Sequence, residues 1–240
     1  MNVIGVVGYK DSGKTTLVRR LSRALRQRGR CVAVIKHTAH RVDPPDKDTR
    51  LLREAAHQVA IISDRATGLF WDEPMSLEDA LVYLEADLVV VEGFKRQQTY
   101  PKIACLRDEP DDADLFDGLI VAAVGPGTYV PPDVPCFERE AAEPLAELAE
   151  AVAFKLPALD CGACGYETCA ELAREIVAGR AEVGDCVSLH PPQVQVTVDG
   201  RPLPMKGFVA DMVRNTVLGL LSSLRGFRPG DVTIEIEGEA

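Results

Sequence analysis

The sequence lacks any apolar stretch long enough to cross a membrane. One of its longest uninterrupted apolar runs is the short segment from Leu119 to Val124, whereas a membrane-spanning helix needs about 20 apolar residues. The chain also opens without the positively charged segment that begins a secretory signal peptide. We therefore expect a cytoplasmic protein that has no membrane partner.

Asparagine, histidine and net positive charge are also scarce. Asparagine occurs only at Asn2 and Asn215, so the N-K-x-D sequence that reads guanine in GTPases is absent. The 4 histidines form no run, which argues against a nickel-insertion chaperone. The formal net charge of −10 argues against nucleic acid as a partner. With 46% apolar and 27% charged residues, the 240-residue chain has the composition of a globular protein and not of a disordered one.

The charge is distributed unevenly along the chain. Residues 10–53 hold 13 of the 27 Lys and Arg residues but only 4 acidic residues. A basic segment in an acidic protein suits a local polyanion, such as the phosphate chain of a nucleotide. Most of the arginines in and just after the first expected helix are interpreted as its solvent-facing side: Arg19, Arg20, Arg23, Arg26, Arg28 and Arg30.

Apolar strands alternate with amphipathic helices over residues 1–156. We expect strands at 3–7, 31–35, 59–62, 67–71, 88–91, 103–106 and 119–124, and helices at 14–28, 48–57, 76–84 and 141–156. Several of these strands are continuously apolar, which is typical of a sheet whose two faces are both covered. The alternation predicts an α/β fold with a mostly parallel sheet and helices on both faces.

A glycine-rich sequence follows the first strand and precedes the first helix. It reads Gly-Tyr-Lys-Asp-Ser-Gly-Lys-Thr over residues 8–15 and fits the phosphate-loop pattern G-x-x-x-x-G-K-[ST] at each fixed position. Glycines let backbone N–H groups curl around phosphate oxygens, the lysine adds a charge and the threonine hydroxyl reaches Mg²⁺. The pattern predicts a P-loop NTPase whose triphosphate-binding residues are Gly8, Lys10, Asp11, Ser12, Gly13, Lys14, Thr15 and Thr16.

A second acidic residue is expected near the Mg²⁺, at the carboxyl end of a neighbouring strand. The segment from Asp87 to Glu92 offers two candidates, but Asp87 stands at the opposite end of the strand, about 17 Å away. Glu92 is therefore the expected metal-side acid. Together with Lys14 and Thr15 it would carry any catalysis, which would consist of positioning and charge neutralisation.

A polar group closes the second strand at the same sheet edge. Lys36 and His37 end that strand, and ligands of parallel sheets bind at the carboxyl ends of the strands. We expect both side chains to contact the nucleotide or a second anionic ligand. Asp48, in the acidic segment that follows, is a further candidate Mg²⁺ ligand.

These segments, in this order and spacing, resemble the molybdopterin-guanine dinucleotide biosynthesis protein B (MobB) family. The resemblance rests on residues 8–16, Ile-Lys-His-Thr at 35–38, Lys-Asp-Thr at 47–49 and Asp-Leu-Val-Val-Val-Glu-Gly-Phe-Lys at 87–95, and it covers about residues 1–155. It implies GTP binding with slow hydrolysis, a homodimer, and an adapter role beside a MobA-like guanylyltransferase that joins GMP to the molybdopterin cofactor. It also implies that Lys36, His37, Phe94 and Lys95 surround the nucleotide and the cofactor.

Four of the 7 cysteines fall in the pattern Cys161-x2-Cys164-x4-Cys169-x16-Cys186. In a chain without a secretion signal, such a cluster indicates metal binding rather than disulfides. Four thiolates can complete a [4Fe–4S] cluster or a tetrahedral Zn²⁺ site. Structural zinc usually uses two C-x2-C pairs and only one is present, so we expect [4Fe–4S], with Zn²⁺ as the alternative. The pattern resembles small [4Fe–4S] domains attached to redox and corrinoid proteins.

The composition changes near Pro157 and predicts three parts. These are a P-loop domain at 1–156, a [4Fe–4S] domain at 157–190 and a small α+β module at 191–240. In the last part, valines alternate with polar residues up to Asp199-Gly200, which is a hairpin-turn signal. A helical apolar stripe over 208–224 and a second alternation at 232–236 complete an expected ββαβ pattern.

Two other functions fit the same residues. A small-molecule kinase would also use a phosphate loop and could take its acceptor-binding arginines from Arg41, Arg50 and Arg53. An iron–sulfur redox protein or metallocentre-maturation GTPase would use the cysteine cluster directly. The leading hypothesis is a GTP-binding accessory protein of molybdenum or tungsten cofactor maturation, with a molybdo- or tungsto-enzyme as a further client.

Overall fold

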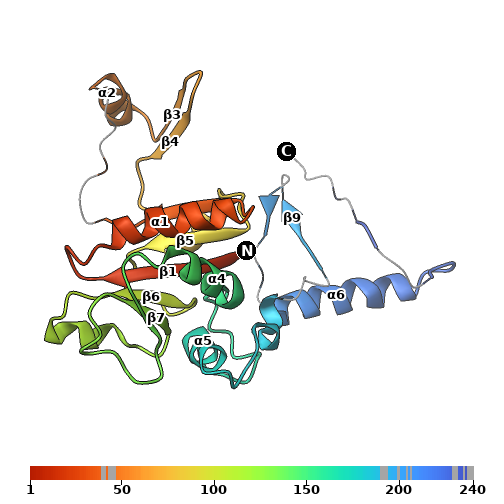
Figure 1. Ribbon diagram of the computed structural model, residues 1–240. Helices are drawn as coiled ribbons and strands as arrows, with labels where there is room; N and C mark the ends of the chain where they lie inside the picture. Colours follow the sequence, from red (N-terminus) through yellow and green to blue (C-terminus); the bar gives the residue numbers. More distant parts are fainter. Residues whose placement is uncertain are drawn as a thin grey trace.

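A computed structural model of the chain describes residues 1–38, 42, 47–189, 194–198, 201–203, 205, 207–228, 232–234 and 236. Its centre is a six-stranded sheet in the order β2-β5-β1-β6-β7-β8 (Figure 1). Every pair of neighbouring strands is parallel. The strands are β1 (Asn2–Gly8), β2 (Val32–Lys36), β5 (Leu88–Glu92), β6 (Lys102–Cys105), β7 (Ile120–Val124) and β8 (Cys136–Phe137). The predicted parallel sheet is confirmed.

Two long helices cover one face of this sheet. They are α1 (Lys14–Gln27) and α4 (Ala142–Val152). Leu17, Leu21 and Leu25 of α1 are buried, and they share one core with Ile4 and Val6 of β1. Their i, i+4, i+8 spacing puts them on a single helix face, as the sequence predicts. The helix therefore turns its arginines away from the sheet.

The opposite face is covered by shorter elements. The helix α3 (Leu77–Val82) begins after Ser76, whose hydroxyl accepts a hydrogen bond from the Asp79 N–H at 3.1 Å. Leu77 packs on Val3, which is the β1 residue next to Ile4 and points to the other side. The 3₁₀ helix η1 (Pro110–Leu115) covers the β6–β7 end of the same face. Both faces are thus covered, as predicted.

The expected strands at 59–62 and 67–71 do not join the main sheet. They form an antiparallel hairpin of β3 (Gln58–Ile62) and β4 (Thr67–Trp71) after α2 (Lys47–Ala55). The connection between them is a tight turn closed by the Ser63 N–H and the Ala66 carbonyl at 3.0 Å. A parallel pair needs a crossover of about a dozen residues, so this short connection permits only a hairpin.

The cysteine-rich segment packs on the sheet through a shared apolar core. It holds α5 (Cys169–Val177), η2 (Val183–Asp185) and η3 (Val187–Leu189). Leu172 and Cys186 are buried with Leu119, which precedes β7, and with Phe154 and Leu156, which follow α4. The expected boundary between residues 156 and 157 therefore runs through a continuous core.

The last part of the chain is described as a ββα unit. Its elements are β9 (Thr197–Val198), β10 (Arg201–Pro202) and α6 (Gly207–Ser222). The first two pair in an antiparallel register, as predicted, although the turn at 199–200 lies outside the described residues. Residues 232–234 and 236, the described part of the expected last strand, are not in a strand, which corrects the ββαβ prediction. Their alternation finds no core, because Ile234 and Ile236 are both exposed.

Candidate nucleotide-binding site and cysteine pocket

The phosphate loop curls between β1 and α1 in the way that its glycines permit. Gly8 and Gly13 have φ angles of 153° and 90°, and Asp11 has 63°. A side chain at Gly8 would lie 2.5 Å from both the Cys105 carbonyl oxygen and the Ser12 hydroxyl. Ser12 itself is buried. The loop backbone therefore adopts a conformation that larger residues at the two glycine positions would disturb.

Lys14 folds back over this loop. Its ammonium group donates hydrogen bonds to the Tyr9 carbonyl and, at 3.5 Å, to the Ser12 hydroxyl. The side chain is half-buried, and this burial lowers the pKa of Lys14 below the ordinary lysine value. A phosphate group at the loop would favour the charged form of this amine.

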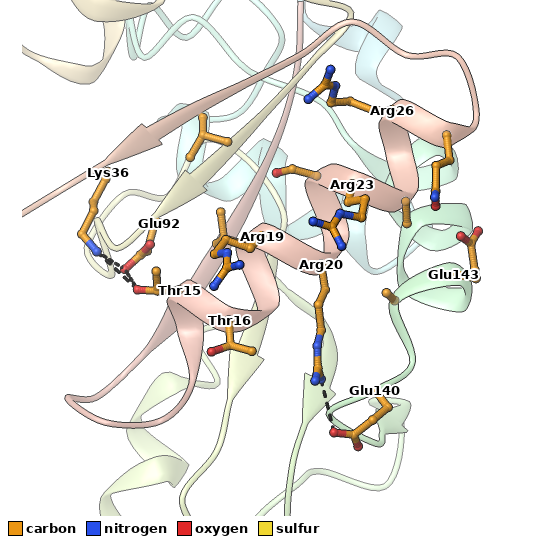
Figure 2. A pocket seen from close by; sticks show the side chains of 16 residues that line it. Thr15, Thr16, Arg19, Arg20, Arg23, Arg26, Lys36, Glu92, Glu140 and Glu143 are labelled. Carbon is orange, nitrogen blue, oxygen red and sulfur yellow. Dashed lines mark hydrogen bonds and ion pairs between the residues drawn. The ribbon is translucent and has the colours of Figure 1, made fainter.

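Thr15, Lys36 and Glu92 meet at the carboxyl ends of β2 and β5 (Figure 2). The Thr15 hydroxyl donates to Glu92 Oε1 at 2.7 Å, and the Lys36 ammonium lies 2.8 Å from the same oxygen. Glu92 is buried. Asp87 instead accepts a hydrogen bond from the Cys31 N–H at the other end of the strand. The structure thus brings together three of the predicted site residues and leaves Asp87 out.

The second and fourth segments of the family resemblance also lie side by side. The His37 N–H donates to the Glu92 carbonyl at 2.9 Å, and the His37 and Phe94 rings are 4.5 Å apart. The Lys95 ammonium lies 3.7 Å from the centroid of the Tyr9 ring, which belongs to the phosphate loop. This edge therefore contacts the loop that holds Lys14.

The other predicted site residues lie outside the group of contacts formed by Thr15, Lys36 and Glu92. Lys10 and Asp11 are exposed at the tip of the phosphate loop, and Thr16 is exposed beside it. Asp48 lies on α2, which Figure 1 shows well apart from the phosphate loop. Asp48 is therefore not placed with Thr15 and Glu92. Arg53, one of the arginines considered for a kinase, is on the same helix and donates to the Val42 carbonyl at 2.7 Å.

Arg139 is a residue of this site that the sequence does not reveal. It follows β8 and donates hydrogen bonds to the Ser12 carbonyl at 2.9 Å and to the Leu106 carbonyl at 2.8 Å. A side chain at Gly13 would lie 2.6 Å from its guanidinium. Arg139 thus supports the phosphate loop from a position 127 residues away along the chain.

The four cysteines of the predicted metal site line one pocket. The free volume is about 10 Å³, and the wall is completed by Pro157, Gly162, Tyr166, Thr168, Val187 and Ser188. The backbone curls around it, with positive φ at Asp160 (44°), Gly162 (70°) and Gly165 (89°). The lining cysteines are Cys161, Cys164, Cys169 and Cys186. Their thiols are the donor set of an iron–sulfur or zinc site.

Local interactions hold this pocket in shape. The Asp160 carboxylate accepts a hydrogen bond from the Cys169 N–H at 2.7 Å, and the Cys161 sulfur lies 3.4 Å from the Ser188 hydroxyl. Burial raises the pKa of Cys186, and the neighbouring thiols add to this effect. Within the described ranges, no three His, Cys, Asp or Glu side chains are gathered so as to hold a single metal ion. The four thiols thus share a pocket without converging on one point.

The cysteine pocket and the phosphate loop lie at different levels of the sheet. The phosphate loop follows the carboxyl end of β1, whereas the cysteine-rich segment packs on Leu119, before the start of β7. The five residues of β7 separate these two levels by about 17 Å along the strands. The two sites therefore have separate surroundings.

A strand, a glycine-rich loop and a helix with Lys14 and Thr15 at its start define the chain as a P-loop nucleotide-binding protein. Residues 3–124 match the family described as "MobB: Molybdopterin guanine dinucleotide synthesis protein B". A protein of Methanocaldococcus jannaschii called "Putative molybdopterin-guanine dinucleotide biosynthesis adapter protein" is 32% identical over 99% of this chain and 98% of its own length. The chain belongs to the MobB family.

Further matches agree with this assignment. The adapter protein of Escherichia coli is 36% identical over 44% of this chain and 66% of its own length. The crystal structure of a MobB homologue from Bacillus stearothermophilus covers 63% of this chain and 99% of its own, with 31% identity and a TM-score of 0.51. Bacillus subtilis MobB, at 22% identity and a TM-score of 0.54, shows the same fold. Residues 156–188 match a second family, "FeS: Putative Fe-S cluster".

No helix in the described part of the chain is both long enough and apolar enough to cross a bilayer.

Proposed function

We propose that the protein binds GTP with Mg²⁺ and acts as an adapter in molybdenum cofactor maturation, where it assists the guanylylation of molybdopterin. The proposal is supported above all by one observation: a complete phosphate loop whose Thr15 hydroxyl is 2.7 Å from the buried Glu92 carboxylate. The Methanocaldococcus jannaschii relative, which matches over nearly its whole length, carries the adapter name. The preference for GTP over ATP is inferred from that relationship alone, because the sequence contains no N-K-x-D segment that would recognise guanine.

Each residue of the site has a distinct role in this proposal. The loop N–H groups and Lys14 hold the β- and γ-phosphates, and Thr15 and Glu92 hold Mg²⁺ directly or through water. Lys36 now neutralises Glu92 and shares its Oε1 with Thr15. A bound Mg²⁺ would compete with Lys36 for that oxygen and free its ammonium for the ligand. Hydrolysis, where it occurs, would be slow and would rest on positioning and charge neutralisation.

Nucleotide titration by calorimetry tests the first half of the proposal. GTP in the presence of Mg²⁺ should bind more tightly than ATP, and Lys14→Ala should abolish this binding while the folded fraction remains unchanged. Lys10→Ala is the matched control, because Lys10 would contact the phosphates through its backbone N–H, which alanine keeps, whereas its charged side chain is exposed at the tip of the same loop. Stronger binding of ATP than of GTP would contradict the assignment of GTP.

We further propose that the four cysteines carry a [4Fe–4S] cluster. The match to an Fe–S family supports this assignment, and so does the pocket that all four cysteines line. Iron, sulfide and zinc analysis of protein purified without oxygen tests the proposal. Zinc at one atom per chain, without absorbance near about 400 nm that bleaches on reduction, would show that the alternative metal is correct.

The position of the pocket indicates what the cluster would do. Two of its cysteines, Cys169 and Cys186, share a core with Leu119, and Leu119 lies about 17 Å along the strands from the level of the phosphate loop. A structural role in holding a short segment on the sheet therefore fits better than electron transfer to the nucleotide.

The partners of this function are a MobA-like guanylyltransferase, the molybdopterin cofactor, a molybdo- or tungsto-enzyme client and a second copy of the chain, in the cytoplasm. The α2–β3–β4 segment supports a protein contact, because Leu51, Leu52, Ile62 and Leu69 are large apolar side chains exposed there. Light scattering of the purified chain tests the homodimer, and co-purification with a MobA-like protein tests the adapter role.

A further inference from the structure

A wide groove runs along α1 from the phosphate loop towards the far end of the helix (Figure 2). Its volume is about 1280 Å³. Thr15, Lys36 and Glu92 line its beginning, so it continues directly from the Mg²⁺ side of the nucleotide site. The rest of its wall holds Val34 of β2, Glu140, Glu143 and the arginines of α1: Arg19, Arg20, Arg23 and Arg26.

The arginines in and just after α1 fall into two groups. Those that face the α4 side are neutralised: Arg20 pairs with Glu140 at 3.2 Å, and Arg28 and Arg30 pair with Glu150 at 2.7 and 2.6 Å. The other group, formed by Arg19, Arg23 and Arg26, is exposed and has no ion-pair partner within the part of the chain that the structure describes.

The three unpaired arginines stand in one row. Their i, i+4, i+7 spacing places them on a single helix face over about 10 Å. Like charges at such spacings repel each other and destabilise a helix. The neutralised arginines of the same segment show that nearby carboxylates can compensate such charges, and the protein as a whole carries a net charge of −10. An uncompensated cationic row therefore indicates an anion that is brought by a ligand.

We propose that the groove binds the phosphate groups of a second, organic ligand beside the nucleotide. Guanidinium groups bind phosphate oxygens through paired N–H donors, and a row of three suits a phosphate ester or diphosphate better than a single carboxylate. The nucleotide's own phosphates are held at the loop, and Arg19 lies one helical turn, about 5.4 Å, beyond Thr15. The row is thus a separate subsite that the nucleotide site does not use.

This site goes beyond the proposed function and can be tested apart from it. The protein is first saturated with a non-hydrolysable GTP analogue and Mg²⁺, and inorganic pyrophosphate is then titrated by calorimetry. Pyrophosphate should bind the loaded protein. The double variant Arg19→Gln/Arg23→Gln should weaken this binding at least tenfold, whereas its affinity for the GTP analogue should stay within a factor of two of wild type.

Two controls separate the possible failures. Arg28→Gln removes the same charge from the residue that follows α1, but from an arginine that Glu150 already neutralises, so pyrophosphate binding should remain. Lys14→Ala should lose the nucleotide and keep pyrophosphate binding that still depends on Arg19 and Arg23. Absence of pyrophosphate binding to the loaded protein, or an equal loss in Arg28→Gln, would overturn the subsite. Arginine-dependent binding of polyglutamate without binding of pyrophosphate would show an acidic polypeptide surface instead and would equally overturn it.

Discussion

At the scale of single residues, two features of the phosphate loop disfavour any side chain at Gly13. Gly13 has a φ of 90°, a conformation that costs other residues about 1–2 kcal/mol. In addition, the guanidinium of Arg139 occupies the space where a side chain at Gly13 would be. Gly29, after α1, has a similar φ of 86°, but no atom lies within 4 Å of the position that a methyl group would take there. Alanine at either position would therefore strain the backbone, but only alanine at Gly13 would also meet a neighbouring side chain. A comparison of the two variants distinguishes the effect of strain from the effect of crowding.

We predict that Gly13→Ala weakens GTP binding at least tenfold, because the new methyl group would displace Arg139 and with it the Ser12 carbonyl that Arg139 holds. Gly29→Ala should lower the free energy of unfolding by about 1 kcal/mol through backbone strain alone, and it should leave GTP binding unchanged. Denaturant unfolding and nucleotide titration of both variants provide the measurement. Equal losses of affinity in the two variants would contradict the role given to Arg139.

Lys14 should make nucleotide binding sensitive to alkaline pH. Burial lowers its pKa in the free protein, and bound phosphate favours its charged form, so binding at high pH must be accompanied by proton uptake. The affinity for GTP should therefore fall as the pH rises through the lowered pKa, below the ordinary lysine value of about 10.4. Calorimetry between about pH 8 and 10.4, from above the last phosphate pKa up to the ordinary lysine value, measures this slope. Lys10→Ala should keep the slope. An affinity that stays constant over this range would contradict the prediction that Lys14 must be charged to hold the phosphates.

At the scale of elements, the N-terminal cap of α5 positions one of the four pocket cysteines, Cys169. The Thr168 hydroxyl accepts a hydrogen bond from the Glu171 N–H at 3.2 Å and so caps the helix that begins with Cys169. Ser76 caps α3 in the same way at 3.1 Å, on the side of the sheet that carries no cysteine of the pocket.

Thr168→Ala should therefore lower both the stability and the metal content of the protein. Loss of a cap costs about 1 kcal/mol, and fraying of the first turn of α5 would move the Cys169 thiol. Ser76→Ala should cost a similar free energy of unfolding and retain the metal. The metal-to-protein ratio after gel filtration, together with unfolding curves, checks this prediction. A parallel loss of metal in Ser76→Ala would show that general destabilisation, and not the cap, is responsible.

The elements also show what could be predicted from sequence. The strand of residues 2–8, the loop and α1 were predictable because a short apolar run, a fixed glycine pattern and a period of 3.6 follow one another within a short segment. Glu92 was predictable because the carboxyl ends of parallel strands meet at one edge. Arg139 was not, because its partners Ser12 and Leu106 are distant in sequence and no local pattern marks such a contact. The last expected strand was wrong over its described residues, because alternation alone does not supply a surface to pack on.

At the scale of the whole molecule, an ion pair between a buried lysine and a partly exposed aspartate links the sheet to the cysteine-rich segment. The Lys102 ammonium, on β6, is almost fully buried, lies 2.5 Å from the Asp117 carboxylate and also donates to the Lys95 carbonyl. Arg174, on α5, donates to the backbone carbonyl of Asp117 at 3.1 Å. Because these contacts adjoin the core that Leu119 shares with Leu172, the P-loop part and the cysteine-rich part should unfold as one unit.

The substitution Lys102→Met tests whether the P-loop part and the cysteine-rich part unfold together. Removing the Lys102 ammonium leaves the Asp117 charge uncompensated. Because Asp117 is partly exposed, the cost should be about 2 kcal/mol, below that for a fully buried pair, and the midpoint of unfolding should fall. Loss of metal, followed by absorbance, should move to the same lower denaturant concentration as loss of secondary structure. Adding Asp117→Asn should recover part of the lost stability, because the uncompensated charge is then removed as well. Arg180→Met, which breaks the exposed pair with Glu175 on the same segment, should cost less than about 1 kcal/mol. Metal release that stays at its original midpoint in Lys102→Met would mean that the cysteine pocket is held independently of the sheet.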